Sequence, residues 1–230
     1  MQERTYATPS PRSFACDLAT LCAPTLAGLK PASLFRYQPA PGQDAAAMAA
    51  AWHTELSPRG VTVQVLKQCP RTGAVLVYVY RPARVAKLLA DDRTLAFLAE
   101  EGYTPGTAGE LLAQLAERLC CEQDFPHEIG VFLGYPLADV IGFIRNRGKN
   151  FTACGYWKVY TDPTAAQAEF DRYKKCERIY ARCYYNGIPI NGSTGGSRCI
   201  GNQICHGLGV AGAAPINNCN FAHDKGLLFR

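Results

Sequence analysis

The chain has 230 residues, 48% of them hydrophobic and 19% charged, a balance that can bury a core and excludes a wholly disordered chain. No apolar run approaches the ~18 residues of a membrane helix, and the first residues lack the basic and apolar regions of a secretory signal. The net charge of +5 is too small for the concentrated basic surface typical of nucleic-acid binding, so we expect a cytoplasmic protein that binds neither nucleic acid nor membrane.

The first part of the chain predicts a helix, a short strand and a second helix. Residues 13–23 have the composition of a short helix that ends before Pro24, and residues 34–37 are typical of a short strand. Asp44 can cap a helix that continues to about Leu56, because an aspartate at that position accepts hydrogen bonds from the first free backbone amides.

A β-hairpin is predicted next. Residues 61–65 alternate between apolar and polar, which indicates a half-buried strand. Residues 74–80 are apolar throughout, which is typical of a central strand with both faces covered. The turn residues at 70–73 are too few for a crossover, so the two strands should be antiparallel neighbours.

Three helices are predicted to follow the hairpin. The first begins at Pro82, which suits the first helical position, and ends near Ala90. A second covers residues 92–100. The third begins at Thr107, because Thr107 and Glu110 have the spacing of a capping box.

The remaining elements alternate between strands and helices. Residues 128–134 and 155–160 are predicted strands, and a helix at 136–145 separates them. The Asp-Pro pair at 162–163 opens a last helix that continues to about Tyr185. Strands interleaved with helices predict an α/β fold with a mixed sheet of four to five strands flanked by helices.

The composition changes after residue 187. Residues 188–230 contain eight glycines, five asparagines, three cysteines and no glutamate, and no helical or alternating pattern persists through them. We therefore expect one α/β domain over residues 13–187 and an atypical tail that is disordered or unrelated to the domain, as a shifted reading frame would produce. The odd total of eleven cysteines then indicates a reduced domain plus a separate tail rather than a disulfide framework.

Three stretches of the domain resemble a family of bacterial proteins, mostly from anaerobes, known only as a domain of unknown function. They are CAPTLAGLKP at residues 22–31, FPHEIGVFLGYP at 125–136, and GKN at 148–150 leading into CGYWKVY at 154–160. The resemblance extends from about Phe14 to Gly187. It implies no reaction and no cofactor. Genes of this family often lie near flavodoxin or iron-uptake genes, which implies an iron or redox setting.

Three residues are candidates for catalysis. His127 is suited to proton transfer near neutral pH, and it lies in one of the three motifs. Cys22 and Cys154 also lie in the motifs, and either could form a nucleophile–base pair with His127 if the fold joins them. The alternative is that His127 is a loop residue bonded to backbone, and that both cysteines are small buried apolar residues.

Aromatic and basic side chains near the last predicted strand are candidates for ligand binding. Rings beside cations can hold a planar ligand or a phosphate. The predicted ligand-binding set is Lys30, Glu128, Lys149, Tyr156, Trp157 and Lys158. In the alternative interpretation, Tyr156, Lys158 and Tyr160 share one face of a strand while Trp157 and Val159 face the core.

No metal site is predicted. Cys16 and Cys22 are separated by five residues, as are Cys199 and Cys205, and neither spacing is the two-residue spacing of zinc knuckles and ribbons.

The site is expected where the segment at 22–30, the loop at His127 and the segment at 149–157 converge. The predicted function is binding of a small ligand or cofactor in an iron- or redox-related setting, with a redox protein as a candidate partner. The alternatives are a cysteine- and histidine-dependent enzyme and a module that binds another protein through the aromatic strand edge.

Overall fold

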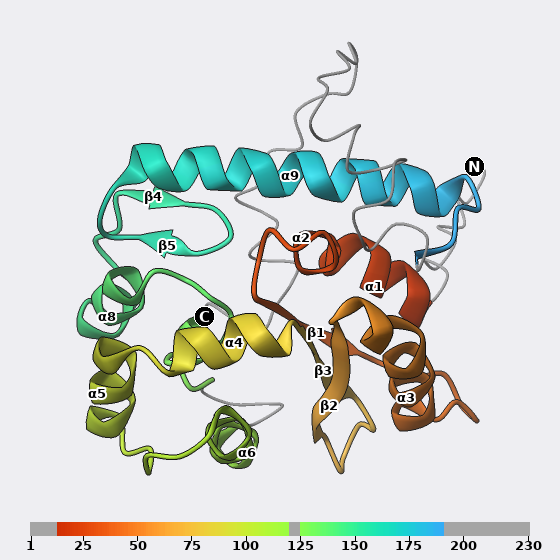
Figure 1. The fold of residues 1–230 in the computed structure, drawn as a ribbon, viewed down its shortest axis with the longest axis horizontal. Helices are drawn as coiled ribbons and strands as arrows, with labels where there is room; N and C mark the ends of the chain where they lie inside the picture. The colour runs from red at the N-terminus through yellow and green to blue at the C-terminus, as the bar shows by residue number, and fades with distance from the viewer. Residues whose placement is uncertain (1–12, 120–124, 191–230) are drawn as a thin grey trace, which may run out of the picture.

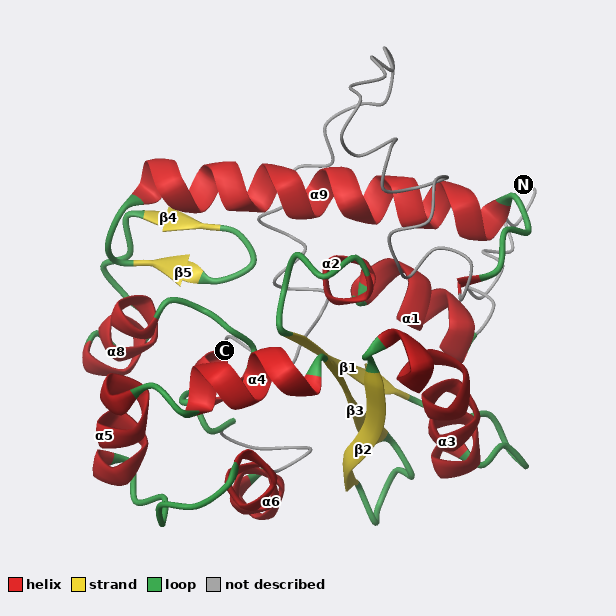
Figure 2. Ribbon diagram, in the orientation of Figure 1, coloured by secondary structure: helices red, strands yellow, loops and turns green. Residues whose placement is uncertain are grey.

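A three-stranded sheet lies between two groups of helices in the computed structural model, which describes residues 13–119 and 125–190 (Figures 1 and 2). The helices are α1 (Phe14–Leu21), α2 (Ala23–Leu26), α3 (Ala45–Leu56), α4 (Pro82–Leu89), α5 (Asp92–Glu100), α6 (Ala108–Arg118), α7 (Ile129–Phe132), α8 (Leu137–Arg145) and α9 (Pro163–Tyr185), with a 3-10 turn η1 (Ser57–Arg59). The strands are β1 (Ala32–Tyr37), β2 (Thr62–Gln68), β3 (Val75–Tyr80), β4 (Ala153–Cys154) and β5 (Lys158–Val159).

The sheet separates two hydrophobic cores. Its order is β1-β3-β2 with both pairs antiparallel, so β3 is the central strand and β2–β3 is the predicted hairpin. Alternate residues of β3 face opposite sides: Leu76 and Tyr78 pack with the helices α4–α8, whereas Val77 and Val79 pack with α1–α3. We call these the α4–α8 core and the α1–α3 core.

Helix α9 joins the two cores. In Figure 1 it runs along the top edge of the molecule, over the β4–β5 hairpin at one end and over α1 at the other. Phe170 and Tyr173 in its first half are buried in the α4–α8 core, and Tyr180 and Cys183 in its second half are buried in the α1–α3 core. The helix therefore holds the two halves of the domain in one arrangement.

The predicted helix starts are confirmed. Asp44 accepts hydrogen bonds from the amides of the second and third residues of α3, and Asp162 does the same in α9. The Thr107 hydroxyl and the Glu110 carboxylate form the reciprocal capping box of α6.

The predicted strand at residues 128–134 is wrong. This segment forms the single helical turn α7, in which the Leu133 amide donates to the Ile129 carbonyl at 3.0 Å. Gly134, with φ of 78°, ends the turn. The segment is surrounded by the core on all sides, so every residue of α7 is apolar, and a short apolar run has no periodicity that distinguishes strand from helix.

The single sheet of four to five strands is not confirmed. Among the described residues, five strands divide into a sheet of three and a sheet of two. Strands β4 and β5 pair with each other, Ala153 with Val159 and Cys154 with Lys158. Part of the predicted strand at 155–160 is instead the tight turn of this hairpin, closed by the Gly155 amide and the Trp157 carbonyl at 3.0 Å.

The predicted tail at 188–230 lies outside the described residues from 191 onward. Ile190, just before that point, is only 4% exposed and packs in the α1–α3 core. Over the described part of the chain, no helix combines the length and the apolar character needed to cross a membrane.

Candidate functional site

A narrow pocket opens beside Trp157, between α7, α8 and the β4–β5 hairpin, and we call it the aromatic slot. Its walls are mainly aromatic and aliphatic, and its polar members are few. It is lined by Phe125, His127, Ile129, Gly130, Tyr135, Asp139, Val140, Phe143, Trp157 and Lys158. The slot and its open mouth enclose about 390 Å³, but the centre of a water molecule fits in only about 20 Å³ of it. The enclosed part of the slot therefore has room for about one water molecule, and a larger ligand would pack at its open side.

Asp139 positions the hairpin that carries Trp157. It lies in the first turn of α8 and is only 2% exposed. Its carboxylate accepts hydrogen bonds from Trp157 Nε1 at 2.8 Å, the Tyr160 amide at 2.8 Å, and the Thr161 amide and hydroxyl at 3.0 and 2.9 Å. Since a buried carboxylate needs such donors, and the donors need an acceptor, this cluster fixes the indole relative to α8.

Two further aromatic rings pack against Trp157. Its ring centroid lies 5.2 Å from that of Tyr135 and 4.6 Å from that of Phe170. The Lys30 ammonium lies 4.9 Å from the Tyr135 ring centroid, a cation–π distance. Burial raises the pKa of Tyr135 well above its usual value, so this wall of the slot stays neutral.

Two nitrogen-bearing side chains stand at the mouth. The His127 ring is exposed, lies edge-on to Phe143 with centroids 4.9 Å apart, and makes no hydrogen bond to any described residue. The half-buried Lys158 Nζ donates to the Gly148 carbonyl at 2.8 Å and lies 5.6 Å from the Phe143 ring centroid. The mouth therefore combines a flat apolar surface with groups able to donate hydrogen bonds.

A second pocket, the outer hollow, shares Trp157 and Asp139 with the slot. Its other walls come from the segments around Pro31 and Gly134, from Arg84 on α4, and from the first turns of α9. It is roomier than the slot, with about 330 Å³ open to the centre of a water molecule. The three motif segments of the sequence thus meet around Trp157.

The structure brings some of the predicted site residues together. His127, Trp157 and Lys158 line the slot, and Lys30 lies behind its Tyr135 wall. Tyr156 packs against Tyr173 of α9, with ring centroids 5.1 Å apart.

Other predicted residues lie elsewhere. Cys22 is fully buried in the α1–α3 core, whereas His127 is exposed at the slot, so the fold does not join this pair. Cys154 is exposed on β4 and is not among the residues that line the slot. Lys149 is exposed in the loop after α8.

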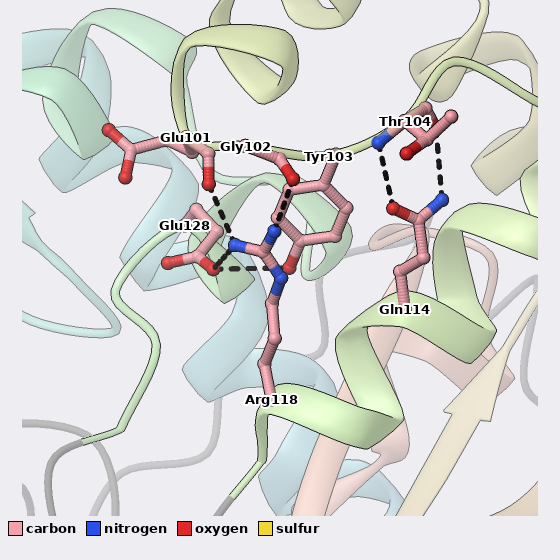
Figure 3. Close-up of polar contacts among 7 residues, drawn as sticks. All are labelled: Glu101, Gly102, Tyr103, Thr104, Gln114, Arg118 and Glu128. Carbon is pink, nitrogen blue, oxygen red and sulfur yellow. Dashed lines mark hydrogen bonds and ion pairs between the residues drawn. The ribbon is translucent and has the colours of Figure 1, made fainter.

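Glu128 is buried and holds the His127 loop in place (Figure 3). Its carboxylate accepts a hydrogen bond from the Tyr103 hydroxyl at 3.1 Å and forms an ion pair with Arg118 at 3.6 Å. Arg118 lies 3.9 Å from the Tyr103 ring and donates to the carbonyls of Glu101 and Gly102 at 2.7 and 2.6 Å. Glu128 therefore ties the His127 loop to the connection between α5 and α6.

Electrostatics within this cluster agree with its geometry. Burial, reinforced by the Glu128 carboxylate, raises the pKa of Tyr103 far above its usual value. Burial and the same carboxylate also raise the pKa of Glu101. Next to the cluster, Gln114 on α6 exchanges two hydrogen bonds with the backbone of Thr104, at 2.8 and 2.9 Å (Figure 3).

Replacing Tyr103 by Phe is expected to lower the free energy of unfolding at pH 7 by about 2 kcal/mol, because the buried Glu128 carboxylate loses a hydrogen bond. Above pH 10 the difference in unfolding free energy between the wild type and the variant should narrow. At that pH the Tyr103 hydroxyl of the wild type ionises only in the unfolded state, which lowers the stability of the fold by about 1.4 kcal/mol per pH unit. The Phe variant has no hydroxyl and does not lose stability in this way. Urea unfolding at pH 7, 10 and 11 measures both effects; a constant difference would contradict the assignment.

Sequence reasoning missed Asp139, Tyr135 and Phe143. One signal for Asp139 was available: a tryptophan predicted to face the core needs a hydrogen-bond acceptor for its indole nitrogen. Among the described residues, no group of three or more histidine, cysteine, aspartate or glutamate side chains is arranged to hold a metal ion.

Comparisons with known proteins give one finding. A model of a family of proteins of unknown function matches residues 18–192. This range contains all three motif segments and every residue that lines the slot and the outer hollow. No curated protein and no solved structure matches the chain.

Proposed function

The chain belongs to DUF3793, a family of proteins of unknown function, and from its geometry we propose that it binds a small organic molecule in the aromatic slot. One observation carries the proposal: a pocket with mainly apolar walls is built around a tryptophan that a buried aspartate holds in place. Small-molecule sites are typically concave, mostly apolar and equipped with a few placed polar groups.

The slot defines what such a ligand would look like. The rings of Phe143, Tyr135 and Trp157 offer an apolar surface against which a flat ring can pack, because aromatic rings pack well at offset or edge-on geometry. His127 and Lys158 at the mouth can bond its polar substituent. The outer hollow beside the slot is roomier, and we propose flavins and haem, which suit the iron or redox setting that the family resemblance implies, as further candidate ligands.

The test uses Trp157 as its own reporter. The chain has two tryptophans, and Trp52 lies on α3 in the α1–α3 core, so Trp52→Phe leaves Trp157 as the single emitter. The variant is titrated with flavins, nucleotides, haem, iron salts and small aromatic acids and amides. At least one compound is expected to change the Trp157 emission in a saturable way.

The matched control is Trp157→Phe, in which Trp52 is the remaining tryptophan. A change in the Trp52 emission measures how much of the signal comes from light absorption by the ligand itself. A true slot ligand changes the emission of the first variant and leaves that of the second unchanged. Equal changes in both, or no change with any compound, would refute the proposal.

The alternative functions have less support from the geometry. A Cys22 nucleophile paired with His127 is not supported, since Cys22 is fully buried in the α1–α3 core whereas His127 is exposed at the slot. The aromatic strand edge proposed for a protein partner is largely inward: Trp157 is buried, and Tyr156 packs on α9.

A further inference from the structure

The outer hollow has the space for a ligand that the enclosed part of the slot lacks. About 330 Å³ of the hollow is open to the centre of a water molecule, against about 20 Å³ in the slot. Together with its open mouth the hollow encloses about 770 Å³, which lies within the ~300–1,000 Å³ of ordinary small-molecule sites. The groups that line the hollow therefore decide which molecule it can hold.

Opposite charges line the hollow from different elements. The cation is Arg84 on α4, and the acids are Asp139 on α8, Asp162 at the N-cap of α9 and Glu169 on α9 itself. Among the described residues, Arg84 forms no ion pair with any of these three carboxylates. The cationic and acidic groups of the hollow thus do not neutralise each other by direct contact.

The Arg84 guanidinium has donors to spare. Its side chain is exposed, and one terminal nitrogen donates to the Gly28 carbonyl. A guanidinium carries five N–H donors in a planar fork, so one bond to a carbonyl leaves N–H groups for a second partner. A carboxylate is the partner that matches this fork, because its two oxygens can accept two parallel hydrogen bonds.

Two of the three acids have oxygen atoms left for a ligand. Asp139 is saturated, since four donors already bond its carboxylate. Asp162 uses Oδ1 to cap α9, and its Oδ2 bonds no described residue. Glu169 lies 3.6 Å from the exposed Arg172, and an exposed ion pair of this length is weak. Burial, followed by the Glu169 carboxylate, raises the pKa of Tyr173, so that hydroxyl stays a neutral donor to Glu169.

Much of the remaining lining is apolar. Leu29 and Pro31 contribute from the first motif segment, Pro136 from the second, and Ala165 from the first turn of α9. None of these side chains can bond a polar group, so they favour an apolar part of a ligand. The hollow thus combines a guanidinium, two carboxylates and an aliphatic surface.

We propose that the outer hollow binds a small apolar zwitterion, either a free amino acid or a dipeptide. Its carboxylate bonds the Arg84 guanidinium, and its ammonium bonds Glu169, with Asp162 Oδ2 as a second acceptor. A ligand with a single charge would leave one of these walls without a partner. The inference concerns a pocket other than the aromatic slot and does not depend on a ligand in the slot.

The experiment is calorimetric titration of the wild type with L-leucine and L-leucyl-L-leucine, and with the N-acetyl and C-terminal amide derivative of each. It is done at about pH 6.5, where an amine of pKa about 7.7–8.0 keeps its proton. At least one parent compound is expected to bind about tenfold or more tightly than both of its derivatives, because each derivative loses one charge-assisted hydrogen bond. The parent that binds more tightly distinguishes an amino acid from a dipeptide.

Two variants assign each charge of the ligand to its wall. In Arg84→Gln the preference for the parent over its amide should fall below about threefold, whereas the preference over the N-acetyl derivative remains. Glu169→Gln should show the converse. The matched controls are Lys87→Gln on α4 and Asp171→Asn on α9, two exposed residues that line neither pocket, and both should keep the two preferences.

A third pair of variants locates the binding. Ala165→Trp places a large side chain in the hollow and should abolish binding, whereas Ala168→Trp, at an exposed position of α9 that lines neither pocket, should leave it unchanged. Binding that persists in Ala165→Trp would overturn the inference. So would equal affinities for parents and derivatives, or no binding of either parent at millimolar concentration, and these two results need only the wild type. Neither result bears on the slot, whose ligand is detected by the Trp157 emission.

Discussion

Gly134→Ala is expected to lower the free energy of unfolding by about 3 kcal/mol. A Cβ at this position would lie 2.3 Å from Pro31 Cγ and 2.6 Å from Pro31 Cδ, inside any tolerable contact. A ring fixed to the backbone cannot move aside as a flexible side chain can, so overpacking adds to the strain of φ at 78°. This contact joins the first motif segment to the second, so the outer hollow should be disturbed as well.

Urea unfolding measures this effect, and Gly73→Ala is its matched control. Gly73 also has a left-handed φ, 69°, but an added Cβ would meet nothing within 4 Å. Gly73→Ala should therefore lower the free energy of unfolding by about 1 kcal/mol, the cost of the left-handed backbone conformation alone. Adding Pro31→Ala to Gly134→Ala should restore part of the lost stability. Equal losses for the two glycine variants, without rescue, would mean that the Pro31 contact is not close.

Asp139→Ala is expected to cost about 4 kcal/mol of unfolding free energy. The change leaves four donors, on Trp157, Tyr160 and Thr161, without their acceptor in a buried place. Each unsatisfied buried donor is destabilising by about 1–3 kcal/mol, although water entering the gap offsets part of the total. In the Trp52→Phe background, Trp157 emission should shift to longer wavelength as water reaches the indole.

Two variants calibrate this result. Asp171→Ala removes an exposed carboxylate on α9 whose bond is to Gln167, and it should change stability by less than about 0.5 kcal/mol. Thr161→Val removes one of the four donors and should cost about 1 kcal/mol. A near-wild-type Asp139→Ala protein would show that Asp139 does not hold the hairpin.

Local rules predicted much of this fold. The starts of α3, α6 and α9 follow from Asp44, Thr107 and Asp162, because caps act between residues two or three apart and need no distant partner. The central position of β3 follows from its unbroken apolar run, which only a strand covered on both faces requires.

The errors arise where tertiary packing decides the structure. Residues 129–132 are apolar because the core surrounds α7, and that burial hides whether the turn is helical or extended. The division of the strands into two sheets depends on which strands β4 and β5 pair with. Strand pairing is decided by tertiary packing, so a local sequence pattern does not predict it.

The same distinction applies to the candidate site. His127, Trp157 and Lys158 could be named from their motifs, and the structure places all three around one slot. Their separation from Cys22 could not be foreseen, because it depends on the sheet standing between two cores. Asp139 was hidden as well, since an aspartate in a first helical turn usually reflects only the favourable charge near a helix N-terminus.

The most direct test of a slot that binds a small organic molecule is a crystal structure of the protein with 4-bromobenzoate, the bromine located by its anomalous scattering. We predict bromine in contact with the rings of Phe143, Tyr135 or Trp157. Bromine bound only elsewhere on the molecule, or an empty slot at a saturating concentration, would contradict it.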